Sequence, residues 1–189
     1  LEKLGFPRES KLVRFFPELD DALEWVEDEY LNEALPERLH RRALDLSGFE
    51  FFRGIPDQAL ATLSIHVSEK QFSDNNKIFS SGDTGDEIFF IRKGSVRIEI
   101  PLDTGLTHHL ATIERGSFFG DMSFLENETQ SADAVAIGDV ELYTISRKDF
   151  GYIIEKYPDV AGKFFERLAS EMSHRLRLNL VELKALGEN

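Results

Sequence analysis

The stretch FFGDMSFLENETQSADAVA, residues 118–136, combines residue types that could bind an anion through the backbone. Gly120 precedes a short predicted helix, and helix N-termini present unpaired N–H groups at the positive end of the helix dipole. The side chains oppose a strong anion site, because the only basic residue between Glu114 and Asp133 is Arg115. The stretch therefore predicts a cradle of backbone N–H groups that lacks a cationic side chain.

The remaining sequence must supply the elements that hold this stretch in place, and its composition is that of a folded domain. The chain has 189 residues, 41% of them hydrophobic, so it can bury one core of ordinary size. Its 16 phenylalanines and single tryptophan supply core bulk with few polar groups. It has no cysteine, which excludes disulfides and thiolate metal sites and is typical of a reducing compartment. We therefore expect a cytoplasmic location.

The net charge of −13 opposes binding to nucleic acid and to anionic lipid surfaces. The best basic run, residues 38–42, is too short to overcome this field, and we interpret it as a solvated helix face or a linker. No apolar stretch approaches the ~20 residues that a membrane span requires. The sequence predicts neither a nucleic-acid partner nor a membrane span within these residues.

From residue 67 to residue 149, short β-rich runs alternate with turn signals such as Gly82-Asp83 and Lys93-Gly94. Regular turn signals between such runs predict an all-β sandwich or barrel. In SVRIEI, residues 95–100, the alternation predicts inward-pointing Val96, Ile98 and Ile100 and outward-pointing Ser95, Arg97 and Glu99.

Helical periodicity frames the β-rich region on both sides. Residues 13–16 predict a short strand, and residues 17–31 predict an amphipathic helix that needs a packing partner. Residues 36–66 predict further helical pieces. After the β-rich region, residues 150–187 predict a short helix and then a long one, separated at Pro158.

The long C-terminal helix has apolar residues at alternating steps of four and three residues, which is a heptad pattern. This pattern favours a coiled coil between two copies, and so a homodimer. Packing of the helix on the β-domain of its own chain is the alternative. One polar residue in the seam would cost stability and fix the register. The predicted seam consists of Phe165, Ala169, Met172, Leu176, Asn179, Leu183 and Leu186.

Three segments, GDTGDEIFFIRKGSVRI, IERGSFFGDMSFLENETQSADAVA and VELYTISRKDF, resemble the cyclic-nucleotide-binding domain family in order and spacing. The resemblance covers about residues 46–180. It implies a β-roll with a small-molecule pocket, and a ligand that repositions the helices behind the roll. In this family the phosphate-binding cassette reads Phe-Gly-Glu, a variable run, and then Arg-Ser/Thr-Ala. The candidate ligand-binding residues are therefore Phe119, Gly120, Asp121, Met122, Ser123, Gln130, Ser131 and Ala132.

Two positions of this cassette depart from the family pattern. Asp121 replaces the Glu that accepts the ribose 2′-OH, which shortens the side chain by one methylene. Gln130 replaces the Arg that pairs with the cyclic phosphate, so a neutral amide stands where the family has a charged, bidentate donor. Losing such a contact in a partly desolvated pocket costs roughly 2–5 kcal/mol. We therefore expect weak binding of cyclic AMP and cyclic GMP.

A second resemblance covers about residues 1–33. The segment KLVRFFPELDDALEWVEDEYL is similar to the last strand and helix of a STAS domain, the cytoplasmic module of SulP-type anion transporters. Some of those transporters continue into a cyclic-nucleotide-binding-like domain. This resemblance implies that the chain comes from the cytoplasmic tail of a membrane transporter. An unrelated linker helix is the alternative.

The same β-roll architecture also occurs in cupin metalloenzymes, which makes His108, His109 and Glu114 worth testing as ligands. Adjacent residues on a strand point to opposite faces, so the two histidines cannot share a metal ion. A serine-histidine-aspartate arrangement and a P-loop are not visible either. The sequence thus predicts no catalytic residue, no metal site and no enzyme.

As a whole, the sequence predicts an α+β fold, mainly β, in which a double-stranded β-helix or jelly-roll β-roll is flanked by N-terminal helices and a long C-terminal helix. Residues 1–35 form the STAS-like end or linker. Residues 36–189 form the cyclic-nucleotide-binding-like domain, with the β-roll at about 67–149 and helices at 150–187. The predicted function is a non-enzymatic regulatory or sensor domain. A ligand-free dimerisation module and a true cyclic AMP or cyclic GMP receptor are the alternatives, and cyclic nucleotide is the only ligand implied.

Overall fold

The computed structural model describes residues 43–102 and 107–187, without the side chains at 178–179, 181–183 and 185–187. Contacts along the chain divide it into two units, residues 1–40 and 41–189. All of the described residues belong to the second unit. The strand and helix predicted at 13–31, the basic run at 38–42 and the STAS-like segment lie outside the described residues.

The described part begins with two 3-10 turns, η2 (Leu46–Gly48) and η3 (Glu50–Phe52), and the helix α3 (Asp57–Ser64). The strands are β1 (Ser68–Phe72), β2 (Lys77–Phe79), β3 (Glu87–Pro101), β4 (Thr107–Ile113), β5 (Phe118–Phe119) and β6 (Asp133–Ser146). The short helix α4 (Asp121–Glu126) lies between β5 and β6 in the chain. The helices α5 (Arg147–Lys156) and α6 (Pro158–Gly187) follow β6.

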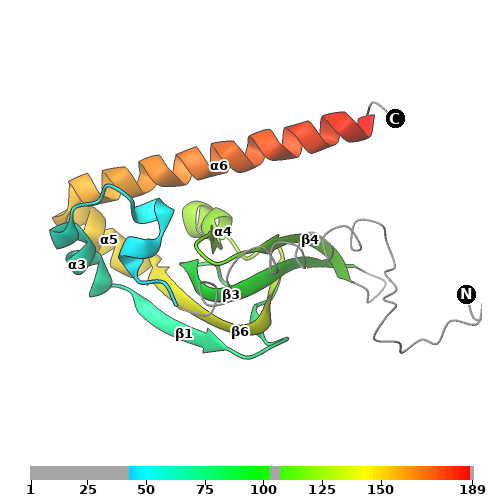
Figure 1. Cartoon of the computed structure of the whole chain (residues 1–189), viewed down its shortest axis with the longest axis horizontal. Coiled ribbons are helices and arrows are strands. Elements are labelled where there is room, and N and C mark those ends of the chain that lie inside the picture. The colour runs from blue at the N-terminus through cyan, green and yellow to red at the C-terminus, as the bar shows by residue number, and fades with distance from the viewer. Residues whose placement is uncertain (1–42, 103–106, 188–189) are drawn as a thin grey trace, which may run out of the picture. The chain divides into compact units, whose positions relative to one another are not determined.

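All strand pairs are antiparallel, and the main path through the sheet runs β1-β6-β3-β4, with β2 also paired to β6 and β5 to β3. The long strands β3 and β6 form the centre of this β-roll, and helices stand before and after it in the chain (Figure 1). The predicted fold class, α+β and mainly β with a β-roll between helices, is confirmed.

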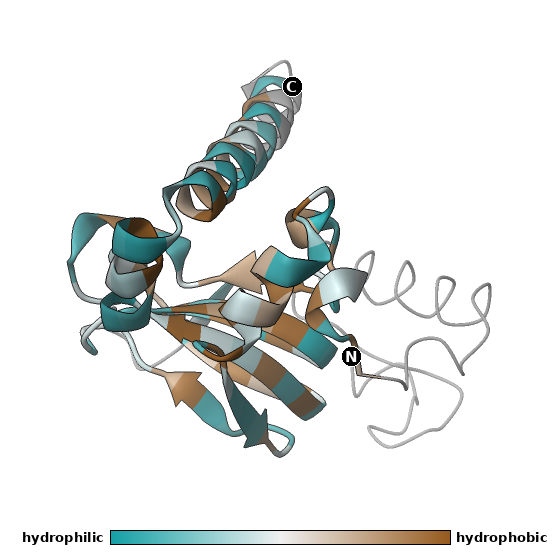
Figure 2. Ribbon diagram, turned by 90° about the vertical axis from the view of Figure 1, so that its left-hand side faces the viewer, coloured by the Kyte–Doolittle hydropathy of each residue, from teal (hydrophilic) through white to brown (hydrophobic). Residues whose placement is uncertain are grey.

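Two hydrophobic clusters hold the domain together, one on each side of the central strands. The first cluster lies inside the roll and includes Phe89, Phe119 and Leu142. The second packs the helices against the opposite face of the strands and is rich in phenylalanine, with Phe51 at its centre. The ring of Phe51 lies 5.0 Å from that of Phe118 and 4.9 Å from that of Phe164. Figure 2 shows the alternation of hydrophobic and hydrophilic residues along the strands that makes two such clusters possible.

The predicted alternation in residues 95–100 is correct at its beginning and wrong at its end. Val96 is fully buried, but Ile100 is 37% exposed and Glu99 is buried. The register between β3 and β4 shifts between Ile98 and Glu99, which marks a bulge. The extra residue of this bulge is Leu110 in β4, because Ile98 and Glu99 face Ala111 and His109, whereas β3 stays in register with β6 at these positions.

The helix α5 begins earlier than the predicted residue 150, because Ser146 caps it. The Ser146 hydroxyl accepts a hydrogen bond from the Asp149 backbone N–H at 3.1 Å. The ring of Phe150 then packs against α6, at 4.5 Å from Phe164 and 5.2 Å from Phe165. Through these contacts α5 anchors the first turns of α6 on the domain.

Candidate functional site

A pocket of about 700 Å³ lies between the β-roll, α4 and α6. Its volume is within the range of small-molecule sites. Every residue of the predicted cassette, Phe119 to Ser123 and Gln130 to Ala132, lines this pocket. The other lining residues are Phe79, Ile98, Leu110, Ala111, Thr112, Ile113, Glu114, Ser117 and Arg175.

Gly120 connects β5 to α4 in a conformation that requires glycine. Its φ is +77°, in the left-handed region that L side chains rarely adopt. A Cβ atom here would lie 2.9 Å from Cδ2 of Phe89 and 3.0 Å from the carbonyl oxygen of Glu87. Phe89 itself is stacked on Phe119, with ring centroids 5.0 Å apart. The glycine therefore lets the cassette backbone pass directly over the inner cluster of the roll.

The front of the cassette, defined as residues 118–123, presents a carboxylate and a hydroxyl to the pocket. Asp121 and Ser123 are buried, whereas Met122 is exposed at the pocket mouth. The Ser123 hydroxyl donates to the Gly120 carbonyl oxygen at 3.2 Å. Asp121 is the residue at which the family resemblance implies an acceptor for a ligand hydroxyl.

The carboxylate of Asp121 already has a partner, and sequence reasoning missed it. Arg175 reaches down from α6, and its Nη1 donates to Asp121 Oδ1 at 3.4 Å. Its Nη2 donates to the Phe118 carbonyl oxygen at 2.6 Å, and its Cζ lies 4.5 Å from the Phe118 ring centroid. We call these three contacts the Arg175 clamp. Among the residues that line the pocket, Arg175 is the one with a cationic side chain.

The tail of the cassette, defined as residues 129–133, is fixed by the backbone. Gln130 donates its N–H to the Asp83 carbonyl oxygen at 2.8 Å and accepts from the Gly82 N–H at the same distance. Its side chain lines the pocket and only 6% of the residue is exposed. A buried neutral amide therefore stands where the family pattern has a guanidinium.

The last residue of the tail, Asp133, has a buried carboxylate that forms an ion pair. Lys77 Nζ lies 2.5 Å from Asp133 Oδ2, and the Ser81 backbone N–H donates to Asp133 Oδ1 at 2.8 Å. The hydrogen bond from Lys77 lowers the pKa of Asp133 below its ordinary value of 3.8, and that from Ser81 acts in the same direction. Because the same interaction raises the pKa of Lys77, both groups keep their charges at neutral pH.

Arg147, the first residue of α5, links the cassette helix to the helices behind it. Its Nη2 donates to the Ser123 carbonyl oxygen at 2.8 Å, and its Cζ lies 5.4 Å from the Phe124 ring centroid. Phe124 in turn packs edge-on against Phe150 of α5 at 5.6 Å. The Nε of Arg147 is buried without a hydrogen-bond partner in the described part of the chain. A displacement of α4 would therefore reach α5 directly.

The predicted seam lies on α6, apart from the cassette. Phe165 is 42% exposed and Leu176 is 60% exposed, and Ala169 is also exposed. Met172 is partly buried against the helix-facing cluster. The side chains of Asn179, Leu183 and Leu186 lie outside the described residues. Of the four described seam residues, Phe165, Ala169 and Leu176 are thus exposed, whereas Met172 packs on its own domain.

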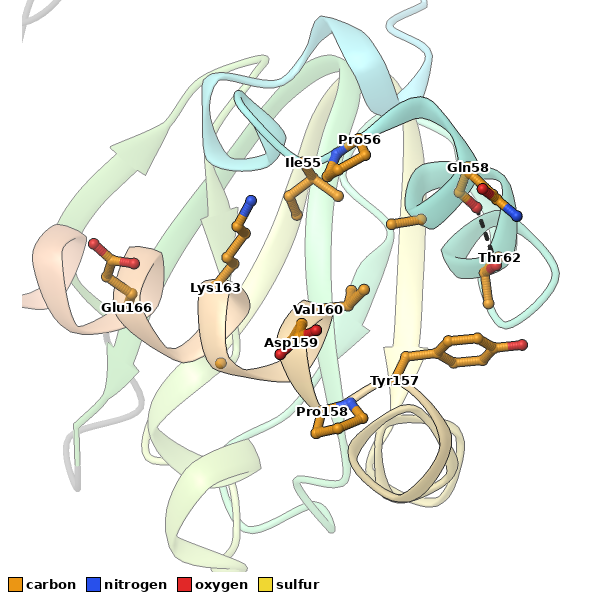
Figure 3. Close-up of a pocket in the computed structure, with 12 residues that line it drawn as sticks. Ile55, Pro56, Gln58, Thr62, Tyr157, Pro158, Asp159, Val160, Lys163 and Glu166 are labelled. Atoms are coloured by element: carbon orange, nitrogen blue, oxygen red, sulfur yellow. Dashed lines mark hydrogen bonds between the residues drawn. The ribbon is translucent and has the colours of Figure 1, made fainter.

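A second depression, of about 850 Å³, lies between α3 and the first turns of α6. Figure 3 shows that Gln58 and Thr62 approach it from α3 and that Val160 and Lys163 approach it from α6. Two of its polar side chains bond to the nearby backbone, since Thr62 Oγ1 donates to the Gln58 carbonyl oxygen at 3.0 Å and Lys163 Nζ to that of Gly54 at 3.2 Å. The cassette residues do not face it.

The described ranges lack the features of two other kinds of site. Residues 43–102 and 107–187 contain no group of three or more histidine, aspartate or glutamate side chains that could hold a metal ion. Within the same ranges, no helix has the length and apolar character needed to cross a bilayer. His109 instead lies 3.2 Å from the Thr112 hydroxyl through its Nε2.

Comparison with known proteins agrees with this geometry. Residues 69–157 match the model of the cyclic nucleotide-binding domain family. The chain is 31% identical to Glutaminase 1 of Bradyrhizobium diazoefficiens, over 89% of this chain and 27% of that protein. It is 30% identical to the cyclic AMP receptor protein of Thermus thermophilus, over 75% of this chain and 64% of that protein. The chain thus spans between about a quarter and two thirds of these relatives.

Among solved structures, the catabolite activator protein of Thermus thermophilus superposes with a TM-score of 0.62 at 28% identity. The superposition covers 72% of this chain and 62% of that protein. The segment that matches the family model contains nearly all of β1, the strands β2 to β6, the whole cassette and α5. Residues 69–157 therefore carry the sequence pattern of the cyclic nucleotide-binding domain family, and the described part of the chain has a β-roll fold like that of the Thermus activator.

Proposed function

We propose that this domain is a non-enzymatic regulatory module in which occupancy of the cassette pocket sets the position of α6. One observation carries the proposal: the pocket is lined by the cassette and by α6 together, and Arg175 joins the two. A ligand that binds differently to two arrangements of α6 shifts the balance between them. The contacts of Arg147 and Phe150 offer a second route from α4 to the same helix.

The proposal includes weak binding of cyclic AMP and cyclic GMP. Gln130 offers a neutral amide to a cyclic phosphate, and Asp121 is engaged by Arg175. The missing guanidinium lowers the affinity by about 30-fold or more, which corresponds to about 2 kcal/mol. The Thermus relative is named for cyclic AMP, and its likeness to this chain supports a nucleotide-shaped pocket but not the same affinity.

The test is calorimetric titration of the protein with cyclic AMP and with cyclic GMP, alongside the Gln130→Arg and Gly120→Trp variants. We expect binding weaker than about 10 μM in the natural sequence, tighter binding in Gln130→Arg, and none in Gly120→Trp. An unchanged titration of Gln130→Arg would contradict the alignment of the cassette. Tight binding by the natural sequence would favour a true cyclic nucleotide receptor.

A second candidate function, self-association, is favoured by the exposed apolar side chains of α6. Leu176 and Leu180 are both more than half exposed. Leu176 belongs to the predicted seam and Leu180 lies beside it, so a second copy that covers them would form the coiled coil that the heptad pattern predicts. Sedimentation of a Leu176→Glu, Leu180→Glu double variant tests this, with the exposed Ser170→Glu as control. We expect the natural sequence and the control to sediment as dimers and the double variant as a monomer. A monomeric natural sequence would contradict the proposal.

We further propose that the domain belongs to the cytoplasmic tail of a SulP-type anion transporter. The support is the STAS-like segment at residues 1–33. Since the chain spans only 27% of the glutaminase it resembles, domains of this kind also occur beside other partners. The residues that precede Leu1 test the proposal. Repeated apolar segments of ~20 residues would support it, and an enzyme domain there would contradict it.

A further inference from the structure

The Arg175 clamp occupies the acceptors at the front of the pocket. Arg175 Nη2 donates to the Phe118 carbonyl oxygen at 2.6 Å, and Nη1 donates to the Asp121 carboxylate at 3.4 Å. The aromatic ring of Phe118 lies below the guanidinium, with Cζ at 4.5 Å from its centroid. Hydrogen bonds to charged groups and cation–π contacts both stabilise this arrangement.

Along the described part of α6, Arg175 is also the last residue whose side chain contacts the rest of the domain. The buried side chains of α6 are Val160, Ala161, Phe164 and Leu168, all in its first half. Beyond Arg175, every described side chain of α6 is exposed. The position of the second half of α6 therefore depends on the contacts that Arg175 makes.

We propose that Arg175 is an internal competitor for the front of the pocket. A ligand that donates to the Asp121 carboxylate, through a hydroxyl or an amino group, displaces the guanidinium and thereby releases the second half of α6. This rests on the proposed function, in which the same pocket takes a small molecule. It adds two points to that function. The front of the pocket selects ligands that carry hydrogen-bond donors in place of an anion, and ligand binding releases the second half of α6.

Electrostatics favours a donor over an anion at this point. The acidic side chains that line the pocket are Glu114 and Asp121, and Arg175 is the cationic one. When a ligand displaces Arg175, the Asp121 carboxylate loses its partner while it is still mostly buried, with 9% of its side chain exposed. A buried carboxylate without a donor is costly, so the ligand must supply one.

The first test measures the clamp without any ligand. A double-mutant cycle of unfolding free energies uses Arg175→Met, Asp121→Asn and the pair, with Arg177→Met as the control. Arg177 is exposed on the same helix and does not line the pocket, so it matches the change in charge. We expect a coupling between Arg175 and Asp121 equal to a factor of about 3 to 10 in the folding equilibrium constant. A coupling near zero overturns the proposal.

The second test measures competition with adenosine, which has the ribose hydroxyls but no phosphate charge. An NMR titration follows the amide signals of Gly120 and Asp121 in Arg175→Met and Arg177→Met. We expect Arg175→Met to bind adenosine at least about threefold more tightly, because the competing guanidinium is gone. Equal shifts in the two variants, or shifts in neither, overturn the proposal.

The two tests also separate this inference from the proposed function. Coupling without adenosine binding would mean that the clamp exists but that the pocket is not a nucleoside site. Adenosine binding without coupling would keep the pocket as a ligand site and remove Arg175 as its competitor.

Discussion

The front and the tail of the cassette are held by different parts of the domain. The tail is held by the roll itself, through backbone hydrogen bonds between Gln130 and residues 82–83 and through the Lys77–Asp133 pair. The front begins in β5, which pairs with β3, and beyond that strand it is held by side chains from the C-terminal helices. Arg147 of α5 binds the Ser123 carbonyl oxygen, and Arg175 of α6 binds Asp121.

This difference separates a fixed side of the pocket from a responsive one. The backbone hydrogen bonds of Gln130 join the tail to the turn between β2 and β3, so the tail moves with the roll. A long arginine side chain on another helix can exchange partners without unfolding anything. A ligand that contacts the tail does not displace it, because the tail is fixed to the roll. A ligand that contacts the front acts on α5 and α6.

The largest expected effect concerns Gly85, which packs closely against Ser123 of the front and against Glu128, just before the tail. Its Cβ position overlaps the side chain of Ser123 and lies 2.8 Å from the carbonyl oxygen of Glu128. We expect Gly85→Ala to destabilise the protein by about 3 kcal/mol, because α4 must move away from the loop. Gly151→Ala is the matched control. Its Cβ meets nothing within 4 Å in the middle of α5, so it should stabilise the protein by up to about 1 kcal/mol. Urea unfolding measures both, and equal effects would contradict the close approach at Gly85.

The next effect concerns the tail alone. We expect Asp133→Asn to cost about 2 kcal/mol at neutral pH, because charge-assisted hydrogen bonds from Lys77 and Ser81 are weakened. The hydrogen bond from Lys77 holds the folded-state pKa of Asp133 below 3.8, so its contribution is present above about pH 5. It is lost as the pH falls through the lowered folded-state pKa.

The measurement for this prediction is urea unfolding of Asp133→Asn and the natural sequence at several pH values between about 7 and 3, which covers the range in which the contribution begins to fall. The difference in unfolding free energy should stay constant at neutral pH and shrink in acid. A difference that grows as the pH falls would contradict the assignment of Asp133 as an ionised partner.

A smaller effect is expected at the front, where Arg147 joins α4 to α5. Arg147→Met keeps much of the length of the side chain and removes the hydrogen bond to Ser123, but it also removes the buried Nε that has no partner in the described residues. These changes oppose each other, so we expect a loss of about 1 kcal/mol. Lys148→Met removes the same charge at an exposed neighbour and should change stability by less than about 0.5 kcal/mol. Thermal unfolding compares the two, and equal losses would argue against Arg147 as the link.

Local sequence patterns predicted the roll, because strands and turns depend on short-range signals, whereas the family resemblance identified the cassette residues. The turn signals and the alternation in β3 indicate strands before any contact is known. Gly120, Asp121 and Gln130 line the pocket together, as the family resemblance implied. The exception within the strands is the end of β3, where Glu99 is buried and Ile100 is exposed against the period-two alternation.

Contacts between distant segments could not be predicted in the same way. Arg175 and Asp121 are 54 residues apart, and Arg175 stands beside Leu176 in a helix whose pattern favours self-association. Nothing in the sequence of α6 tells which of its basic residues faces the cassette. The same holds for Arg147, whose partner Ser123 lies 24 residues away across β6. The residues that hold the front are therefore known only once the helices are placed.

Amide hydrogen exchange tests most directly whether the front belongs to the helices and the tail to the roll. We expect Arg175→Met to accelerate exchange about fivefold in residues 119–126 and in α6 beyond residue 172, relative to Arg177→Met. Residues 129–134 should exchange at the rate of the natural sequence. Equal acceleration of front and tail, or acceleration of neither, would contradict the account.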